Sequence, residues 1–426
     1  MLSSRWFSLL PVLAFPFASP ANEWPTWRGP NGDGTLSAEA DYPIEWSTEK
    51  GGLWKADLPA PGNSSAIVAK GKVFVTVAEQ GGRVRSLLCF DAETGEQLWK
   101  RSVDYGKEDP THKTNPFSAA SPVADLETGT VFAWYGNAGL WAYDFDGEER
   151  WHRDLGTDYA HQWGANAASP VLFGETLIVH AGPGMAARLF AVNRVSGETI
   201  WRKELSSAES RDIDEFKGSW ATPLIRRAGS EAEMLIGLPG KLTAFDPASG
   251  EERWQVGGLS DLCYSNVLVG DDLAVYLCGF GGPGIGVRLP EAGATGDLTD
   301  SHRLWADPPK GKNQNPQRIG SGQIVGDHLY LLNEPGVIQC LVTATGESVW
   351  RERLGRRSWS SMNHVGGRLY VNDSSATTFV IDPDPAGLKL IATNPLEPRL
   401  HTNASLAFAD GRIFLRTDSA LYALGD

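Results

Sequence analysis

The sequence predicts an all-β fold: an eight-bladed β-propeller of four-stranded antiparallel blades, with the last blade closed by an N-terminal strand. Three observations lead to this prediction. The phrase "LLCFDAETGEQLWK", which begins at Leu87, recurs in altered form at Leu189, Leu242 and Ile338. Tryptophans at the ends of such phrases lie 45 to 53 residues apart along the chain. The final repeat stops before its tryptophan strand, and an unmatched copy of that strand lies near the N-terminus.

Each repeat reads as four short strands. The first strand ends at a turn rich in Gly and Asp and the second leaves it, as in "VLVGDDLAVYLC" and "QIVGDHLYLLN". The third strand precedes the "TGE" motif, and the fourth ends near the tryptophan. Alternating apolar residues bounded by Gly, Asp and Asn are typical of strands, and no amphipathic helix of normal length is evident. The first strands of the eight repeats begin near Ser64, Ser121, Ser169, Thr222, Ser265, Ser321, Ser361 and Ala404.

The eighth repeat lacks a fourth strand, because the sequence ends with "LYALGD". The segment "GLWKADLP" (Gly52–Pro59) matches fourth strands of other repeats, such as "QLWKRSV" and "TIWRKEL". An unfilled sheet edge exposes backbone groups and apolar side chains. We therefore expect this segment to pair with the last repeat and to close the ring.

The tryptophan of each fourth strand is expected to be structural. Its large ring can pack across to the neighbouring blade and donate a hydrogen bond through its N–H. In the turn, the Asp of D-x-x-T/S-G-E can accept bonds from the backbone, and the Gly adopts a positive φ. Leu390 stands where the seventh repeat should carry its tryptophan, so we expect that blade to pack more loosely. The structural tryptophans are Trp54, Trp99, Trp151, Trp201, Trp254, Trp305 and Trp350.

Composition and charge narrow the functional classes. An apolar fraction of 41% supports a folded core in a chain of 426 residues. The net charge of −14 disfavours binding to nucleic acid or to an anionic membrane surface, because both are negatively charged.

The N-terminus is interpreted as a secretory signal. It carries one early positive charge, Arg5, then an apolar run over 6–17 and the small residues Ser19 and Ala21. The run is too short to span a bilayer, although an uncleaved hydrophobic anchor is the alternative. No Cys near the cut offers a lipid attachment site. We expect a signal peptide at 1–21, an N-terminal extension at 22–44, a single propeller at 45–426, and a periplasmic or secreted protein.

The four cysteines, Cys89, Cys263, Cys278 and Cys340, form no CxxC motif, so neither a zinc ribbon nor a redox CxxC site is indicated. Cys89 and Cys340 occupy nearly the same place in two repeats, which favours buried small hydrophobes. A two-residue turn within Val269–Asp272 would put Cys263 opposite Cys278. In an exported protein this pair could form a cross-strand disulfide, or the two could remain buried thiols.

The repeated phrase "LxxaDxxTGExxW" resembles the repeat of the pyrroloquinoline-quinone-type (PQQ-like) β-propeller family, from about Glu45 to Ala423. The segments "WPTWRGPNGDGTLS" (Trp24–Ser37), "HKTNPFSAASPV" and "WGANAASPV" resemble a pattern of exported PQQ-like propellers from Planctomycetes and Verrucomicrobia. The layout is also similar to that of BamB, the periplasmic subunit of the outer-membrane protein assembly machinery. The resemblance implies an exported propeller and leaves its activity open.

A PQQ-dependent quinoprotein dehydrogenase is one function that the resemblance implies. In such enzymes the quinone lies over a Trp floor, Ca²⁺ polarises it, an Asp acts as base, and adjacent cysteines form a disulfide. This chain contains no Cys-Cys pair and no haem CxxCH motif, and no residue can be matched to the calcium ligands or the base. We therefore expect no catalytic residue, no metal site and no cofactor. PQQ and Ca²⁺ are expected only under this alternative.

A binding or scaffolding propeller is the preferred interpretation, with a carbohydrate-binding propeller as a second alternative. Short turns such as "KGK", "GDD" and "TGE" share one face of the ring, here called the short-turn face. Long connections such as "VDYGKEDPTHKTNPFSAA" and "DPPKGKNQNPQRIG" reach the opposite, long-loop face, where recognition is expected. Aromatic and amide side chains there would suit a sugar, peptide or ring-shaped ligand. They could also serve as packing between blades and as caps of strands.

The candidate binding residues precede the innermost strands on the long-loop face. They are His112, Asn115, His161, Trp163, Asn166, Trp220, Tyr264, Gln314, Arg318, Trp359, Asn363, His401 and Asn403. No carboxylates accompany His112 or His161 at a metal-binding spacing. We expect a monomer that binds an envelope protein or a small or oligosaccharide ligand, with no nucleic acid and no transmembrane segment.

Overall fold

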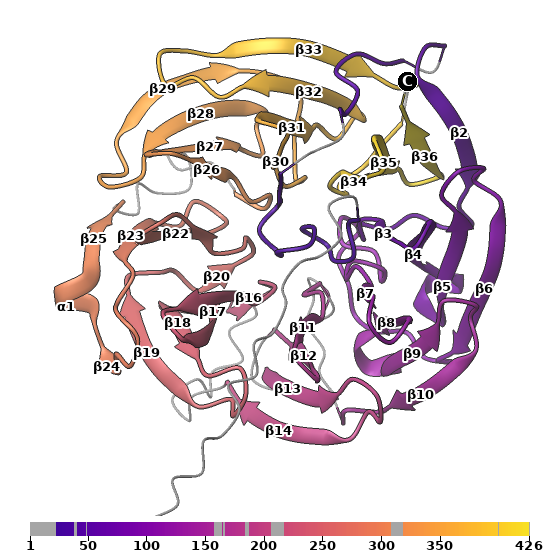
Figure 1. Cartoon of the computed structure of the whole chain (residues 1–426), viewed down its shortest axis with the longest axis horizontal. Helices are drawn as coiled ribbons and strands as arrows, with labels where there is room; N and C mark the ends of the chain where they lie inside the picture. The colour runs from indigo at the N-terminus through magenta and orange to yellow at the C-terminus, as the bar shows by residue number, and fades with distance from the viewer. Residues whose placement is uncertain are drawn as a thin grey trace, which may run out of the picture.

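A computed structural model describes residues 23–37, 41–47, 49–156, 164, 167–183, 187–205, 217–307, 318–398 and 400–425. It confirms the predicted fold class. Eight four-stranded antiparallel sheets are arranged around a ring, as Figure 1 shows from the face. In each sheet the first strand of the repeat lies innermost and the fourth strand lies at the periphery.

The blades of the first half follow the chain in order. Blade 1 contains β3 (Ile67–Ala69), β4 (Lys72–Glu79), β5 (Val84–Asp91) and β6 (Gln97–Asp104); blade 2 contains β7 (Val123–Asp125), β8 (Thr130–Trp134), β9 (Leu140–Asp144) and β10 (Glu149–Arg153). Blade 3 contains β11 (Val171–Phe173), β12 (Thr176–Ala181), β13 (Arg188–Asn193) and β14 (Thr199–Glu204); blade 4 contains β16 (Leu224–Ala228), β17 (Glu231–Leu238), β18 (Lys241–Phe245) and β19 (Glu252–Gly257).

The second half completes the ring. Blade 5 contains β21 (Leu268–Val269), β22 (Leu273–Leu277), β23 (Gly284–Arg288) and β25 (Arg303–Ala306); blade 6 contains β26 (Gln323–Val325), β27 (His328–Leu332), β28 (Val337–Val342) and β29 (Ser348–Arg353). Blade 7 contains β30 (Asn363–Val365), β31 (Arg368–Asn372), β32 (Thr377–Asp382) and β33 (Lys389–Pro395); blade 8 contains β34 (Ala407–Ala409), β35 (Arg412–Arg416), β36 (Ala420–Leu424) and β2 (Gly52–Asp57). Outside the blades lie β1 (Thr35–Leu36), β15 (Gly218–Ser219), β20 (Leu262–Cys263), β24 (Gly296–Asp297), the helix α1 (Thr299–His302), and the 3₁₀ turns η1 (Gln80–Gly82) and η2 (Gly136–Ala138).

The N-terminal strand β2 closes blade 8, as predicted. It pairs antiparallel with β36, and Trp54 lies opposite Ala423. This pairing ties the two ends of the propeller to each other and gives the last blade its fourth strand.

The core lies between the blades. Phe74 and Cys89 of blade 1, for example, share one buried cluster with Val131 and Ala133 of blade 2. The middle strands are therefore buried on both faces, whereas the peripheral strands alternate between half-buried and exposed side chains. This burial pattern explains the continuous apolar runs of the second and third strands.

Six blade tryptophans bridge to the following blade. The indole Nε1 donates to a backbone carbonyl of the next third-to-fourth-strand turn, and the pairs are Trp54–Ala92 (3.1 Å), Trp99–Phe145 (3.0 Å), Trp151–Arg194 (3.2 Å), Trp201–Pro247 (3.1 Å), Trp305–Thr343 (2.8 Å) and Trp350–Asp384 (3.2 Å). In turns that contain the glycine of the D-x-x-T/S-G-E motif, the indole packs against that glycine. A Cβ on Gly95, which has a φ of 74°, would come within 2.5 Å of Trp54.

Every blade tryptophan also faces a small residue on the neighbouring third strand. Cys89 lies opposite Trp99 and Cys340 lies opposite Trp350, while Ala or Gly fills this position elsewhere. A small side chain leaves room for the indole, which explains why these two cysteines occupy equivalent places.

The predicted tryptophan position of the seventh repeat, Leu390, is wrong. By register, Ala392 occupies the tryptophan position and lies opposite Val380, because the turn before it is longer. Ala392 is buried, whereas Leu390 is 45% exposed. In blade 7 the small residue is thus on the fourth strand and the larger one on the third strand, the reverse of the other blades. Val380 fills part of the space that an indole takes in those blades.

The junction between blades 4 and 5 departs from the repeat. In blade 5 the "TGE" turn is replaced by a longer connection, whose strand β24 pairs parallel with β19. Trp254 is fully buried there and donates to Glu233 Oε1 of its own blade at 3.0 Å. The predicted bridge to the next blade is therefore absent at Trp254.

The N-terminal segment 24–36 crosses the ring at the short-turn face (Figure 1, indigo). Trp24 exchanges backbone hydrogen bonds with Val68 of blade 1, and Pro25 accepts one from Ala124 of blade 2. At its other end, β1 pairs parallel with β30 of blade 7. The segment thus spans from blades 1 and 2 to blade 7 and covers the axis on this side.

Candidate functional site

A ring of hydroxyl groups surrounds the axis just before the innermost strands. The backbone N–H of one blade donates to the side chain of the next at 2.8–3.0 Å, in the order Asn266, Ser321, Ser361, Ser405, Ser65, Ser121, Ser169 and Thr222. We call this set the serine ring. The seven bonds begin at Asn266 and end at Thr222, so the ring is open between blades 4 and 5.

Blade 5 carries Asn266 where the other blades carry a hydroxyl. Both side-chain amide atoms of Asn266 are buried without a protein hydrogen-bond partner. A buried amide without a partner costs about 1–3 kcal/mol. The opening in the serine ring therefore leaves polar atoms that a bound water or ligand atom could satisfy.

Arg28 of the N-terminal segment lies beside the serine ring on its short-turn side. Its Nη2 donates to the carbonyl oxygens of Asp33, Gly322 and Met362. The side chain is only 1% exposed, and burial lowers its pKa to about 10. The guanidinium thus joins the segment to blades 6 and 7 and closes this end of the channel with a buried cation. Residues 22–44 were expected to form an extension, and this role was not predicted, although Arg28 between Trp24, Trp27 and a Gly-rich turn was a usable signal.

Three predicted residues meet on the long-loop side of blades 4 to 6. The rings of Trp220 and Tyr264 lie 5.2 Å apart at 55°, and Trp220 Nε1 donates to Gly164 O. Arg318 is 5% exposed, approaches Asp307 Oδ2 at 3.7 Å, and has two guanidinium nitrogens, Nε and Nη1, without a protein partner. Burial lowers the pKa of Arg318. The charge of Arg318 acts on Cys278, and the next residue, Gly279, lies against the Tyr264 ring, so the aromatic pair stands near a desolvated cation.

Trp359 continues this aromatic group at the entry to blade 7. Its Nε1 donates to Glu334 Oε1 at 3.0 Å, and the Arg357 guanidinium lies 5.0 Å from its ring centroid. The charge of Glu334 also helps raise the pKa of Tyr264, after burial as the main cause. We call Trp220, Tyr264, Arg318 and Trp359 the aromatic sector.

Four other predicted residues lie at the entries of blades 8 and 2. Asn403 Nδ2 donates to Asn63 Oδ1, and Asn63 Nδ2 donates to Thr114 O. His112 Nδ1 and Thr114 Oγ1 lie 2.7 Å apart, and Asn115 N donates to His112 O. His401 Nδ1 lies 3.0 Å from Asp418 Oδ2. These polar side chains connect neighbouring blades and form a second, amide-rich sector.

The remaining candidates do not join either sector. Asn363 lies within β30, is 1% exposed and donates from Nδ2 to Leu406 O of blade 8, so it holds two blades together. His161, Trp163, Asn166 and Gln314 lie outside the described residues.

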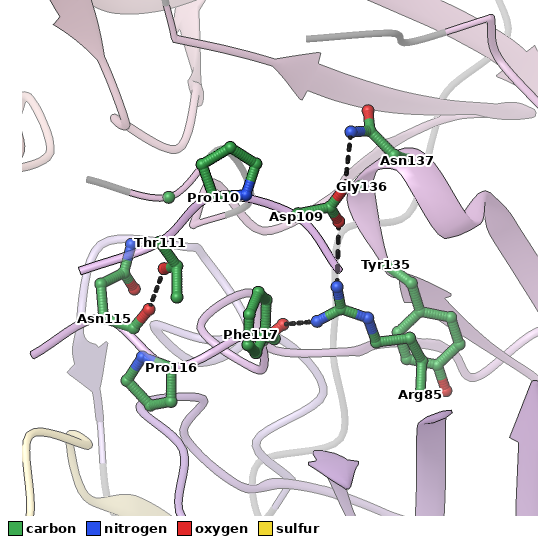
Figure 2. A pocket seen from close by; sticks show the side chains of 11 residues that line it. Arg85, Asp109, Pro110, Thr111, Asn115, Pro116, Phe117, Tyr135, Gly136 and Asn137 are labelled. Atoms are coloured by element: carbon green, nitrogen blue, oxygen red, sulfur yellow. Dashed lines mark hydrogen bonds and ion pairs between the residues drawn. The ribbon is translucent and has the colours of Figure 1, made fainter. Parts of the chain in front are cut away.

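A closed polar cluster anchors the long loop after β6 (Figure 2). Arg85 Nη2 donates to Asp109 Oδ2 at 3.0 Å, and Asn137 Nδ2 donates to Asp109 Oδ1. Arg85 Nη1 also donates to Phe117 O, and the Phe117 ring lies 4.5 Å from the guanidinium. The cavity among these residues measures about 20 Å³. A volume of this size has room for about one water molecule, so the cluster positions a loop and offers no space for an organic ligand. Arg85, a charged residue within the apolar strand β5, was a sequence signal for this cluster that the prediction did not use.

Calcium, which the quinoprotein resemblance implies, requires a cluster of oxygen ligands. Across the described ranges, no three His, Cys, Asp or Glu side chains come together in a way that could hold a metal ion. This part of the chain therefore offers no acidic cluster for a metal. In the same ranges, no helix has the length and apolar character needed to cross a membrane.

The ring of eight blades, with its recurrent "TGE" turn and bridging tryptophan, defines a PQQ-like β-propeller. The chain belongs to the family described as outer membrane protein assembly factor BamB, whose model matches residues 48–233 and 240–424.

The chain is similar to one BamB in part of its sequence and to another BamB in its fold. A BamB of Alkalilimnicola ehrlichii is 26% identical over 199 residues, which cover 45% of this chain and 44% of that relative, so the match spans less than half of either protein. The crystal structure of BamB from Moraxella catarrhalis has a TM-score of 0.60 at 15% identity and covers 88% of this chain and 97% of that one.

Quinoprotein enzymes share the fold at similar distance. A europium-containing methanol dehydrogenase has a TM-score of 0.68 at 11% identity, with 96% of this chain and 99% of that one covered. A quinohemoprotein alcohol dehydrogenase from Comamonas testosteroni has a TM-score of 0.63 at 12% identity, with 96% and 82% covered. At such identities the likeness concerns the fold alone.

Proposed function

We propose that this protein is an exported binding or scaffolding propeller, located in the periplasm or secreted, that engages an envelope protein through its long-loop face. Membership in a family described by outer membrane protein assembly supports a protein partner. The acidic charge of −14 supports a partner other than nucleic acid.

The observation that carries this proposal is the asymmetry of the two faces. The segment 24–36 covers the axis at the short-turn face, and Arg28 fixes it to blades 6 and 7. The turns on that face are short and similar in most blades, with the longer connection of blade 5 as the main exception. The long-loop face is irregular and carries the aromatic sector and the amide-rich sector. Irregular loops on a rigid ring are the usual place for recognition.

The chemistry of the aromatic sector suits contact with a peptide or loop of a partner. Trp, Tyr and Arg side chains are enriched among the residues that dominate the binding energy of protein interfaces. Arg357 lies against Trp359 of the aromatic sector, and His401 belongs to the amide-rich sector. Both are partly exposed, so they can report contact without removing a buried group.

Site-specific photo-crosslinking in the native envelope tests this proposal. A photoreactive residue at Arg357 or His401 is expected to give a discrete adduct with one envelope protein. The matched positions Glu93 and Glu347, exposed on "TGE" turns of the short-turn face, are expected to give none. Adducts that form equally from both faces, or from the short-turn face alone, would contradict the proposal.

Two alternative functions would give different experimental results. A quinoprotein dehydrogenase would show saturable, dye-linked oxidation of an alcohol or aldose after addition of PQQ and Ca²⁺ to the purified protein. A carbohydrate-binding propeller would show saturable quenching of tryptophan fluorescence by oligosaccharides, reduced by Tyr264→Ala, which removes the ring that faces Trp220.

A further inference from the structure

Cys263 and Cys278 come together at the open part of the serine ring. Cys263 ends β20, which pairs parallel with β15, and Cys278 directly follows β22. The predicted hairpin register was wrong by two residues, since Leu268 lies opposite Val275 and Cys263 is not part of that ladder. A different route joins the two segments: Gly279 N donates to Leu262 O, one residue away from each cysteine.

The side chains of Cys263 and Cys278 also lie close together. The Cys263 thiol and the Cys278 sulfur are within hydrogen-bonding reach of each other. Both contact Ser260: its N–H donates to Cys278 Sγ at 3.3 Å, and its carbonyl accepts from Cys263 Sγ at 3.9 Å. Both sulfurs are free thiols and fully buried. A disulfide needs two cysteines whose backbones and sulfur atoms both lie close together, and the bonds through Leu262, Gly279 and Ser260 bring this pair together.

We propose that Cys263 and Cys278 are a dithiol that closes to a disulfide and fixes the aromatic sector of the long-loop face. Tyr264 follows Cys263 directly, and its ring lies against Gly279, where an added Cβ would come within 2.0 Å of it. Trp220 N donates to Cys263 O at 2.8 Å. The bond would therefore tie together the backbone segments that hold both rings of the aromatic pair.

The two thiols differ in their hydrogen-bonding environment. The hydrogen bond from Cys263, followed by those from Ser260 and the charge of Arg318, lowers the pKa of Cys278 to about 7 against the opposing effect of burial. Burial holds the pKa of Cys263 well above its usual value. Geometry points the same way: Cys278 Sγ accepts the Ser260 N–H, whereas Cys263 Sγ donates its proton to the Ser260 carbonyl. Because the thiolate is the nucleophile, this arrangement favours Cys278 as the attacking sulfur and Cys263 as the resolving one.

The oxidant is a low-molecular-weight disulfide such as oxidised glutathione. The Cys278 thiolate attacks one sulfur of it, and one glutathione leaves as a thiolate that takes up a proton. Cys263 then loses its proton and attacks Cys278 Sγ of the mixed disulfide, and the second glutathione leaves. The protein loses two electrons and two protons, and the glutathione disulfide gains them.

Counting thiols in the full chain tests this inference. The protein is refolded with oxidised glutathione, denatured without reductant, and alkylated. Two of the four thiols are expected to react, and a proteolytic peptide pair should join Cys263 to Cys278. Four reactive thiols, or a bond that includes Cys89 or Cys340, would overturn the proposal. So would a glutathione adduct on wild-type Cys278 that is never resolved.

Variants separate the roles of the two sulfurs. Cys263→Ser is expected to retain a glutathione adduct on Cys278, because the resolving thiol is missing, whereas Cys278→Ser should carry no adduct. The matched control C89S/C340S removes the other two buried thiols and must still lose both of its remaining thiols on oxidation. Loss of disulfide formation in that control would contradict the assignment, and the peptide analysis of the wild-type protein stays decisive if a variant fails to fold.

Discussion

Six blade junctions follow one design, and the junction between blades 4 and 5 follows another. At the regular junctions an indole bridges to the backbone of the next turn, and the serine ring continues from blade to blade. Between blades 4 and 5, Trp254 turns to Glu233, the serine ring is open, and an added strand covers the edge of blade 4. The dithiol and the aromatic pair lie at this irregular junction. The comparison shows that the repeated contacts form the ring. Where the repeat is interrupted, polar and reactive groups near the axis lack those contacts.

Removing Glu233 should have the largest effect, because this buried carboxylate holds both Trp254 and Arg226 within blade 4, where the bridge to the next blade is absent. Glu233 is fully buried, accepts from Trp254 and pairs with Arg226 Nη2 at 2.5 Å. Glu233→Ala leaves that guanidinium without its carboxylate, so the free energy of unfolding should fall by about 3–5 kcal/mol. Denaturant unfolding measures this. The control Glu347→Ala, on an exposed turn, should change it by less than about 0.5 kcal/mol; similar values for both would refute the assigned role.

Alanine substitutions at two glycines, one at each kind of junction, allow a direct comparison of the two. Gly95 and Gly296 have φ values of 74° and 84°, but only Gly95 lies against an indole. Gly95→Ala adds a clash with Trp54 to the cost of a left-handed backbone, so we expect a loss of about 3 kcal/mol. Gly296→Ala should cost only about 1 kcal/mol. Equal losses in thermal and denaturant unfolding would mean that the indole contact does not constrain the turn.

Blade 7 tests the rule that each indole needs a small partner. Ala392→Trp places an indole opposite Val380, so overpacking should reduce the free energy of unfolding by about 1–3 kcal/mol. Adding Val380→Ala should recover part of this loss, since alanine is the usual partner. If the double variant is less stable than the sum of the single changes implies in a denaturant titration, the rule fails.

The smallest expected effect is a gain in the free energy of unfolding. Asn266→Ser gives blade 5 the hydroxyl that other blades carry and removes a buried amide without protein partners. The free energy of unfolding should rise by about 1 kcal/mol. The control Ser361→Ala removes the acceptor for Ser321 N in the regular part of the ring and should lower it by about 1 kcal/mol. A destabilising Asn266→Ser would show that Asn266 has a partner of its own near the axis.

Much of the architecture was predictable because it depends on a local pattern repeated eight times. The "TGE" turn, the strand alternation and the missing last strand led to the blade count and to closure by β2. The errors arose where the repeat changes length. Two extra residues moved the tryptophan position from Leu390 to Ala392, and the turn after Val269 shifted the expected pairing near Cys263.

The candidate site was less predictable, because its members come from different blades. The sequence pointed to the long-loop face, yet it could not show that Trp220 meets Tyr264 or that Asn363 serves between blades instead. It also gave no reason to join residues 24–36 to the axis, since their partners lie tens to hundreds of residues away along the chain.

The sequence by itself determined the kind of blade, the number of blades and the way the ring closes, because hydrophobic alternation and turn chemistry act over a few neighbouring residues. Only the tertiary structure decided which end of the channel is covered, where the serine ring is open and which cysteines meet. These features depend on contacts between distant segments, whose geometry follows from how the blades pack around a common axis.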